Sequence, residues 1–187
     1  MGVTNVLLSE HEVILTMLGV LEEIAERLEK EESIDLHDLD RSVEFVKEFA
    51  DRCHHGKEED ILFPAMEEAG VPKEGGPIGV MLNEHDLGRN FIRGLTEAAH
   101  RYQNGDQEAR QDIIRNIHGY VDLLSRHIAK ENQVLFQMTD QVLTDSHQEK
   151  LEQKFKAVQQ ASIGADKYRI FRRLAEELAD KYLFSKV

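Results

Sequence analysis

Two histidine–glutamate pairs fall at a spacing that could hold metal ions inside a helical protein. His54 and Glu58 are four residues apart, and so are His127 and Glu131. Residues four apart lie on the same side of a helix, one turn from each other. Both pairs share their side with apolar residues, where an ionised carboxylate costs several kcal/mol unless it has a partner or a metal. The pairs therefore predict buried metal ligands on two helices.

Two further histidines occupy apolar stripes on two other helical segments. His11 and His85 lie near the starts of their segments, whereas His54 and His127 lie well along theirs. In an antiparallel bundle the start of one helix neighbours the end of the next, so all four imidazoles fall at one level. The predicted metal ligands are His11, His54, Glu58, His85, His127 and Glu131.

This ligand set favours particular metals. Imidazole and carboxylate donors converging from four helices suit two iron or manganese ions better than a closed tetrahedral zinc site. We expect two iron ions ahead of manganese or zinc. The alternative is a purely structural one, in which buried polar residues serve only the specificity of the fold.

Neighbouring side chains on the same helices leave alternatives open. At 100° per residue, His55 and Glu59 point about 100° or more away from His54, toward the flank of the helix. Replacing His54 with alanine should therefore cost more metal than replacing His55. Additional ligands from His55, Glu59 or Glu12 remain open.

Two other residues near the predicted ligands have competing interpretations. Tyr120 lies two turns before His127 on the same face. It either donates a hydrogen bond to a bound ligand or is a core tyrosine bonded elsewhere. Cys53, the single cysteine, is interpreted as a packing residue, and it excludes an internal disulfide.

The elements that must position these residues are helices. Apolar residues recur at helical spacing along nearly the whole chain, and no segment alternates as a strand would. Four long helices with short connections predict an all-α, up-down-up-down four-helix bundle over residues 1–143. Two additional C-terminal helices form an extension over 144–187, packed on the bundle or used for association, for example in a homodimer. The predicted helices span about 4–30, 36–66, 77–102, 107–139, 146–161 and 165–183.

Charge and composition exclude several classes of partner. The formal net charge of −13 over 187 residues disfavours nucleic acid and anionic membrane surfaces. No stretch approaches eighteen consecutive apolar residues, and the N-terminal sequence lacks the basic and apolar regions of a secretion signal. We therefore expect a cytoplasmic protein that binds neither nucleic acid nor membrane.

The ordered motifs resemble those of the hemerythrin-like cation-binding (HHE) family over roughly residues 5–143. The resemblance implies an oxo- or hydroxo-bridged non-haem di-iron centre with the two glutamates as bridges. The motifs that carry it are Glu10-His11-Glu12, His54-His55-Gly56-Lys57-Glu58-Glu59-Asp60-Ile61-Leu62-Phe63-Pro64, Gly76-Pro77 leading to Glu84-His85-Asp86, and His127-Ile128-Ala129-Lys130-Glu131-Asn132.

Departures from the oxygen-carrying hemerythrins bear on function. Those proteins have a second histidine four residues after the first on the third helix, where this chain has Arg89. Their last ligand is an aspartate five residues after its histidine, whereas here Glu131 follows His127 by four. The remaining set is similar to that of iron–sulfur-cluster repair proteins and iron-sensing hemerythrin-like domains.

Because arginine cannot bind a cation, the resemblance predicts a more open centre than a carrier has, unless another ligand takes that position. We expect a protein that binds or reacts with oxygen, nitric oxide or peroxide. Enzymatic reduction of nitric oxide or peroxide, iron donation for cluster repair, iron sensing and reversible oxygen carriage remain alternatives.

Overall fold

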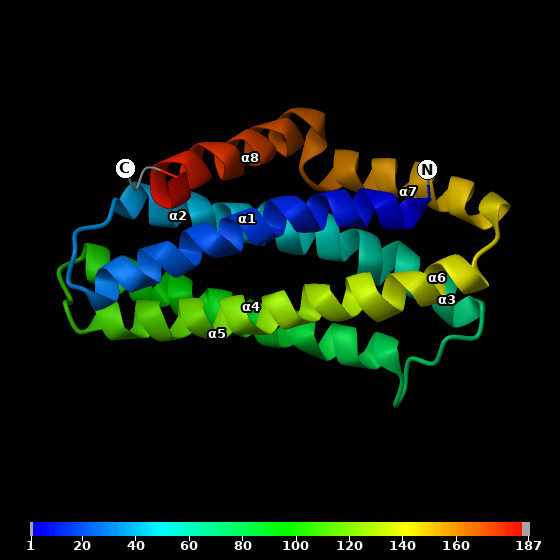
Figure 1. The fold of residues 1–187 in the computed structure, drawn as a ribbon, viewed down its shortest axis with the longest axis horizontal. Coiled ribbons are helices and arrows are strands. Elements are labelled where there is room, and N and C mark those ends of the chain that lie inside the picture. The colour runs from blue at the N-terminus through cyan, green and yellow to red at the C-terminus, as the bar shows by residue number, and fades with distance from the viewer. Residues whose placement is uncertain (1, 185–187) are drawn as a thin grey trace.

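The computed structural model describes residues 2–184, and every regular element within them is a helix (Figure 1). The predicted all-α, hemerythrin-like bundle with additional C-terminal helices is confirmed. The elements in chain order are α1 (Val3–Glu29), α2 (Leu36–Phe45), η1 (Val46–His55), η2 (Glu58–Leu62), α3 (Phe63–Glu68), α4 (Pro77–Gln103), α5 (Ala109–Lys130), η3 (Glu131–Leu135), α6 (Phe136–Val142), α7 (Asp145–Ser162), α8 (Gly164–Ala179) and η4 (Asp180–Phe184).

Local signals end these helices close to the predicted limits. Asp35 precedes α2, and its side chain accepts a hydrogen bond from the backbone N–H of His37 at 3.0 Å, which satisfies a free helical donor. Pro77 opens the first turn of α4, where its missing N–H costs nothing. Gly105 makes the turn between α4 and α5 with a φ of 94°, a conformation that other residues rarely adopt.

Three π-helical segments, η1, η2 and η3, interrupt the second and fourth helices of the bundle. A π-helix bonds each N–H to the carbonyl five residues back, so it holds more residues per turn than an α-helix and rotates by less than 100° per residue. His54 and His55 end η1, Glu58 begins η2 and Glu131 begins η3. The irregular turns thus include three of the predicted ligands, His54, Glu58 and Glu131, and π-helical turns are common at functional sites.

A polar layer divides the apolar core into two parts. Along α1, Leu7 belongs to one hydrophobic cluster, His11 follows it, and Ile14 belongs to the other cluster. The smaller cluster lies at the end of the bundle that holds α3 and α6, and the larger one fills the other end. The predicted ligands therefore lie between two dry, packed regions.

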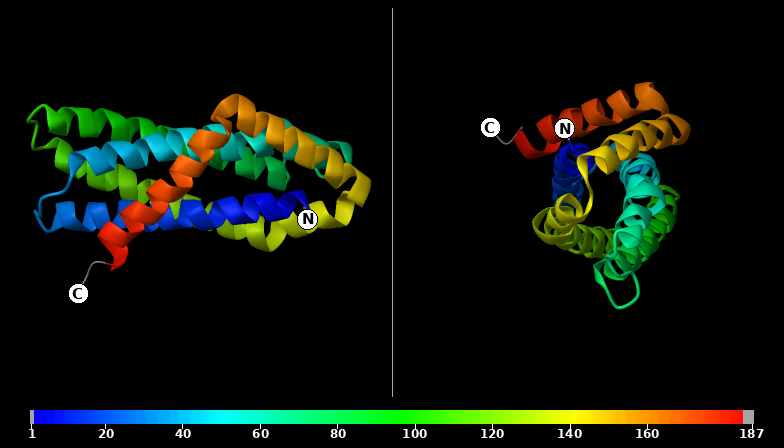
Figure 2. Two further views of the ribbon diagram at one scale, coloured as in Figure 1. Left: turned by 90° about the horizontal axis from the view of Figure 1, so that it is seen from above. Right: turned by 90° about the vertical axis from the view of Figure 1, so that its right-hand side faces the viewer.

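The C-terminal helices lie along the outside of the bundle (Figures 1 and 2). α8 runs beside α1, and α7 runs beside the second helix. Phe171, Leu174 and Leu178 of α8 enter the larger apolar cluster, while Leu151 and Phe155 of α7 enter the smaller one. These apolar side chains of α7 and α8 are thus covered by the chain's own bundle. The domain boundary at residue 143 and association with a second copy stay predictions.

Helix α1 also meets the length and composition of a membrane span, with a mean hydropathy of 1.2 over its most apolar window. Half of that window is buried inside the bundle. The helix also buries Glu10, His11 and Glu23. Its apolar character is that of a core helix.

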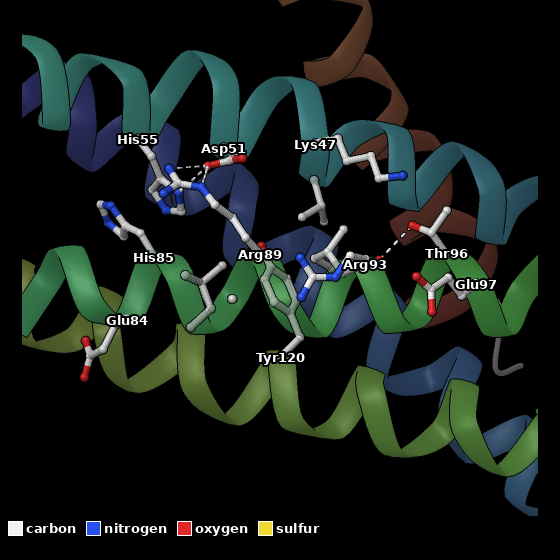
Figure 3. Close-up of a pocket in the computed structure, with 14 residues that line it drawn as sticks. Lys47, Asp51, His55, Glu84, His85, Arg89, Arg93, Thr96, Glu97 and Tyr120 are labelled. Atoms are coloured by element: carbon white, nitrogen blue, oxygen red, sulfur yellow. Dashed lines mark hydrogen bonds and ion pairs between the residues drawn. The ribbon is translucent and has the colours of Figure 1, made fainter.

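A cavity of about 390 Å³ lies beside the polar layer, between η1, α4 and α5 (Figure 3). Its inner end is formed by His55 and His85, and its walls include Ile92, Tyr120 and Leu124. Those three wall residues are almost fully buried. The cavity therefore connects two histidines of the polar layer to the outside of the bundle.

Candidate metal centre

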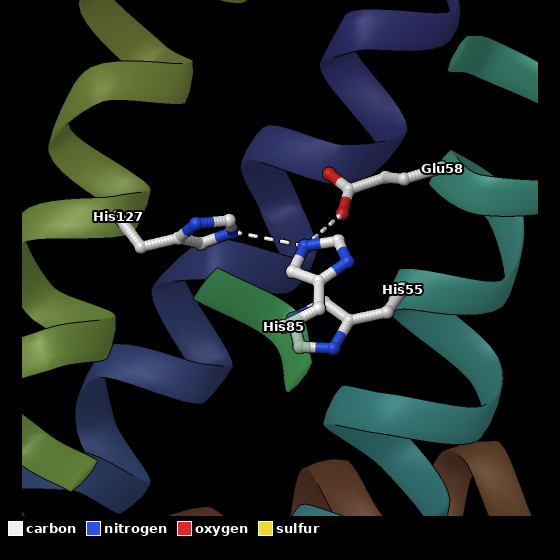
Figure 4. A group of neighbouring side chains, drawn as sticks. All are labelled: His55, Glu58, His85 and His127. Atoms are coloured by element: carbon white, nitrogen blue, oxygen red, sulfur yellow. Dashed lines mark hydrogen bonds and ion pairs between the residues drawn. The ribbon is translucent and has the colours of Figure 1, made fainter. Parts of the chain in front are cut away.

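The structure brings all six predicted residues together in two clusters that share Glu58. The α1 cluster consists of His11, His54, Glu58 and Glu131, and the α4 cluster consists of His55, Glu58, His85 and His127 (Figure 4). Within each cluster, one potential ligand atom from every residue lies within 4.8 Å of the others. All seven side chains are buried. That they bind metal stays a prediction.

In each cluster two imidazoles face each other through their Nε2 atoms. His11 and His54 are separated by 3.0 Å between these nitrogens, and His85 and His127 by 3.1 Å. Their Nδ1–H groups point outward. That of His54 donates to Glu10 (3.0 Å), that of His85 to Glu59 (2.7 Å), that of His127 to Glu84 (2.9 Å) and that of His11 to the side-chain oxygen of Asn132 (2.7 Å).

These outer hydrogen bonds decide which nitrogen carries the proton. A carboxylate only accepts hydrogen bonds, so a neutral imidazole that donates from Nδ1 presents a lone pair at Nε2. Two such lone pairs 3.0 Å apart repel each other unless a cation lies between or beside them. Histidines that bind metals commonly have this outer carboxylate.

The carboxylates of Glu58 and Glu131 make no hydrogen bond within residues 2–184. Both oxygens of Glu58 and both oxygens of Glu131 are fully buried with no hydrogen-bond partner among the described residues. Glu131 lies 3.2 Å from Nε2 of His11 and 3.2 Å from Nε2 of His127, and Glu58 lies 3.5 Å from the corresponding atoms of His54 and His85. Each carboxylate thus spans the two facing pairs. Four unpaired buried oxygens among imidazole lone pairs fit a site for cations.

The pKa values of these two carboxyl groups also fit a site for cations. Burial raises the pKa of Glu58 well above its usual value, and the negative charge of Glu131 raises it further. Burial would also raise the pKa of Glu131, but the electrostatic effect of His127 and His11, whose Nε2 atoms lie 3.2 Å away, outweighs it and lowers that pKa. The two carboxyl groups thus have pKa values shifted in opposite directions, as expected of two acidic groups in one buried site.

A second ring of side chains supports the α1 cluster. Glu10, which accepts from His54, also pairs with Lys57 and accepts a hydrogen bond from the hydroxyl of Tyr168 at 2.9 Å. Glu10 and Lys57 are both 0% exposed. Burial would raise the pKa of Glu10, but the hydrogen bond to His54 and the charge of Lys57 lower it to about 2. The pair is thus a buried ion pair, and α8 reaches it through Tyr168.

Sequence reasoning missed the roles of Glu10, Lys57 and Tyr168. Lys57 follows His54 by three residues, so the two side chains lie on neighbouring positions of the same helix face. A lysine beside a core histidine was the available indication of a buried ion pair. No comparable signal identifies Tyr168, which lies 158 residues from Glu10.

His55, which was expected to point toward the flank of its helix, is buried against α4. Its ring is only 5% exposed and stacks on His85, with ring centroids 3.8 Å apart. Its Nδ1–H donates to Asp51 at 3.3 Å. The spacing of residues did not indicate what would cover this flank, and in the structure α4 packs against it. A residue turned away from α1 therefore meets α4 rather than solvent.

The other candidates for additional ligands lie outside the clusters. Glu12 is exposed on α1. Glu59 accepts from Nδ1 of His85, and it also pairs with Arg89 at 2.5 Å. Arg89 in turn contacts Asp51 at 2.9 Å, so it holds the two carboxylates that orient His55 and His85. The chain places His55, not Arg89, where a further nitrogen could reach the metal.

Comparison with known proteins agrees with this geometry. Residues 3–139 match the family described as the hemerythrin HHE cation binding domain. An uncharacterised protein of Mycobacterium tuberculosis is 27% identical over 130 residues, which are 70% of this chain and 50% of that protein. The iron-sulfur cluster repair protein YtfE of Dickeya chrysanthemi is 37% identical over 86 residues, 44% of this chain and 38% of that protein.

The YtfE protein of Escherichia coli O1:K1 is 31% identical over 85 residues, 44% of this chain and 39% of that protein. The chain spans about half the length of the mycobacterial relative and less of the repair proteins. No solved structure matches it significantly. The family match covers most of the sequence and includes every residue of both clusters, and the chain belongs to the hemerythrin HHE cation-binding family.

Proposed function

We propose that the chain binds two iron ions, one at each cluster, and that it binds or reacts with oxygen, nitric oxide or peroxide. The observation that carries the proposal is the pair of unbonded carboxylates, Glu58 and Glu131, lying between two facing pairs of imidazole nitrogens. Glu58 and Glu131 would hold the ions together with the imidazoles of the two clusters. When bound, iron supplies the electrons that oxygen, nitric oxide or peroxide accepts.

The chain's own residues prepare the ligand atoms. Glu10, Glu59 and Glu84 hold the Nδ1 protons of His54, His85 and His127, so the Nε2 atoms stay free to bind. The surrounding apolar clusters keep water from the α1 cluster, while the cavity leaves the α4 cluster within reach of a small molecule.

The choice between reaction and reversible carriage rests on access. The expectation of a more open centre assumed that no residue replaces the histidine missing at Arg89. His55, which stacks on His85, could provide that missing ligand. Reaction rather than carriage is now supported by the cavity that ends at His55 and His85. A carrier that shields its bound oxygen would not need a cavity of this size.

Iron donation for cluster repair is a second candidate. It is favoured by the similarity to the repair proteins of Dickeya chrysanthemi and Escherichia coli, which includes less than half of this chain. Release of iron to an acceptor would proceed from the α4 cluster, because that cluster borders the cavity. Iron sensing has no specific observation in its favour, and the cytoplasmic location stays a prediction.

Iron loading of the full chain without oxygen tests the proposal. We expect about two iron atoms per chain and, after oxidation, near-ultraviolet absorption of a bridged ferric pair. Glu12→Ala, an exposed change on the same helix as His11, is the matched control and should keep both ions. A folded protein that stays free of iron would overturn the proposal.

Optical spectra then separate the candidate reactions. Addition of nitric oxide or peroxide to the reduced protein should oxidise or change the centre once, and repeated cycles between oxygen and vacuum should degrade the signal. A spectrum that returns intact over many oxygen cycles would instead identify a carrier. Transfer of iron to an apo iron–sulfur protein, faster than to buffer, would identify the repair function.

A further inference from the structure

The cavity beside the α4 cluster is much larger than a diatomic molecule or peroxide requires. Its volume is about 390 Å³, within the range of pockets that hold organic ligands, roughly 300–1,000 Å³. Its floor is apolar and well ordered by packing, with Val46, Ile92 and Leu124 all at most 5% exposed. The cavity is therefore a built feature of the bundle and not a shallow surface depression.

One polar group in this floor has no partner. Tyr120 is 2% exposed and lines the cavity, yet its hydroxyl makes no hydrogen bond within residues 2–184. Its oxygen is not among the fully buried polar atoms, so the hydroxyl is open to the cavity, whereas the hydroxyl of a buried tyrosine usually has a hydrogen-bond partner. In Figure 3 Tyr120 extends from α5 toward α4, and Gly88 of α4 lies against its ring. The hydroxyl is available to a molecule inside the cavity.

The charged side chains around the cavity are either paired or exposed. Three acidic side chains and three basic ones line it, and two of the acidic ones are already paired: Asp51 with Arg89, and Glu84 with Lys130. The remaining lining residues with charge are Glu97, Lys47 and Arg93. These three side chains are exposed, so the unpaired charge lies at the mouth of the cavity, whereas its floor is apolar. A neutral ligand fits this arrangement better than a carboxylate.

We propose that this cavity binds a neutral, apolar organic molecule with one acceptor oxygen, such as a carbonyl compound, and that the Tyr120 hydroxyl donates a hydrogen bond to that oxygen. The apolar body of the ligand contacts Ile92 and Leu124. Its oxygen lies on the side of the cavity that leads to His55 and His85, the inner end. The site belongs to the chain itself and does not depend on the proposed iron chemistry.

Gly88 contributes to the space for this ligand. A Cβ atom built at Gly88 would lie 3.5 Å from the Tyr120 ring, an ordinary contact distance. A longer side chain at this position, on the cavity wall, would extend into the volume and displace a ligand. Gly88→Leu therefore blocks the site, and it does so without a helix-breaking residue.

The test uses the full chain, prepared without metal and again after iron loading, with three small aromatic probes. Acetophenone carries a neutral carbonyl, ethylbenzene has nearly the same shape without an acceptor, and benzoate carries a charge. Binding is followed by nuclear magnetic resonance titration of the protein. We expect one acetophenone per chain, bound about fivefold more tightly than ethylbenzene, in both preparations.

Two variants give the decisive comparison. Tyr120→Phe should weaken acetophenone about fivefold and leave ethylbenzene unchanged, with a thermal unfolding temperature no lower than that of the native chain. Gly88→Leu should abolish binding of both. Tyr102→Phe, a partly buried tyrosine away from the cavity, is the matched control and should change neither.

The contradicting outcomes are equally clear. Equal affinity for acetophenone and ethylbenzene in the native chain would overturn the role of Tyr120. Tightest binding of benzoate would overturn the neutral ligand. Absence of binding by all three probes to a folded native chain would overturn the site. Because binding of the probes is also measured on the metal-free protein, failure of the iron proposal would not be mistaken for failure of this ligand site.

Discussion

The α1 cluster and the α4 cluster have nearly the same donors but different surroundings. The α1 cluster lies between packed apolar side chains and is backed by the buried Glu10–Lys57 pair and by Tyr168 from α8. The α4 cluster borders a cavity of about 390 Å³, and its outer partners, Asp51 and Glu59, are themselves partly exposed. One half of the centre is closed, and the other is accessible.

The difference indicates that two clusters with similar side chains can differ in how firmly they hold a metal ion, because their surroundings differ. A histidine oriented by a fully buried network changes its position little, because every supporting group is itself fixed. A histidine oriented by partly exposed groups, next to open volume, can tolerate an incoming molecule. We therefore expect the α1 cluster to retain its metal firmly and the α4 cluster to exchange ligands.

Glu58→Ala should have the largest effect, because Glu58 belongs to both clusters. We expect loss of both ions from the iron-loaded protein, measured by metal analysis after gel filtration. The metal-free variant should unfold at a higher temperature than the metal-free native chain, since it no longer buries an unpaired carboxylate. Retention of one ion would show that Glu58 does not connect the two clusters.

His54→Ala and His55→Ala compare the clusters directly. The sequence predicts a milder effect for His55→Ala, whereas the structure predicts loss of about one ion from each variant, from the α1 and the α4 cluster respectively. Metal analysis and the rate of release of the remaining iron to a chelator measure this. Release should be slow from His55→Ala, which keeps the closed cluster. Two retained ions in His55→Ala would restore the sequence-based interpretation.

Lys57→Met tests how far the closed half depends on its buried ion pair. Removing one partner leaves Glu10 as an unpaired buried charge, which costs about 3–5 kcal/mol of unfolding free energy. The matched control is Lys130→Met, whose pair with Glu84 has a lysine 42% exposed and should cost less than about 1 kcal/mol. Urea denaturation of both variants measures the difference. Equal losses would remove the distinction between a buried and a peripheral support.

Tyr168→Phe should have the smallest effect, a loss of about 1–3 kcal/mol for a hydrogen bond to a charged group. It should also speed iron release from the α1 cluster, since Tyr168 contacts Glu10 and Glu10 orients His54. Release from the α4 cluster should not change. If both clusters release iron faster, α8 acts on the bundle as a whole rather than on one half.

The helices, the antiparallel bundle and the common level of the six predicted ligands along it could all be predicted from the amino-acid sequence. These follow from local properties: apolar periodicity, caps such as Asp35, and the four-residue spacing of His54 and Glu58. Such features depend on residues close together in the chain. The sequence motifs were also sufficient to indicate the family.

Three features follow only from the packing of the helices: the burial of His55 against α4, the support of His54 through Tyr168 and the cavity beside Tyr120. A change in helical rotation at η1 moves a side chain only slightly, but the position of α4 decides whether that side chain is buried. The contact between Tyr168 and Glu10 joins residues 158 positions apart, and a cavity is the space that several helices fail to fill. These features arise from packing between elements, which local spacing does not encode.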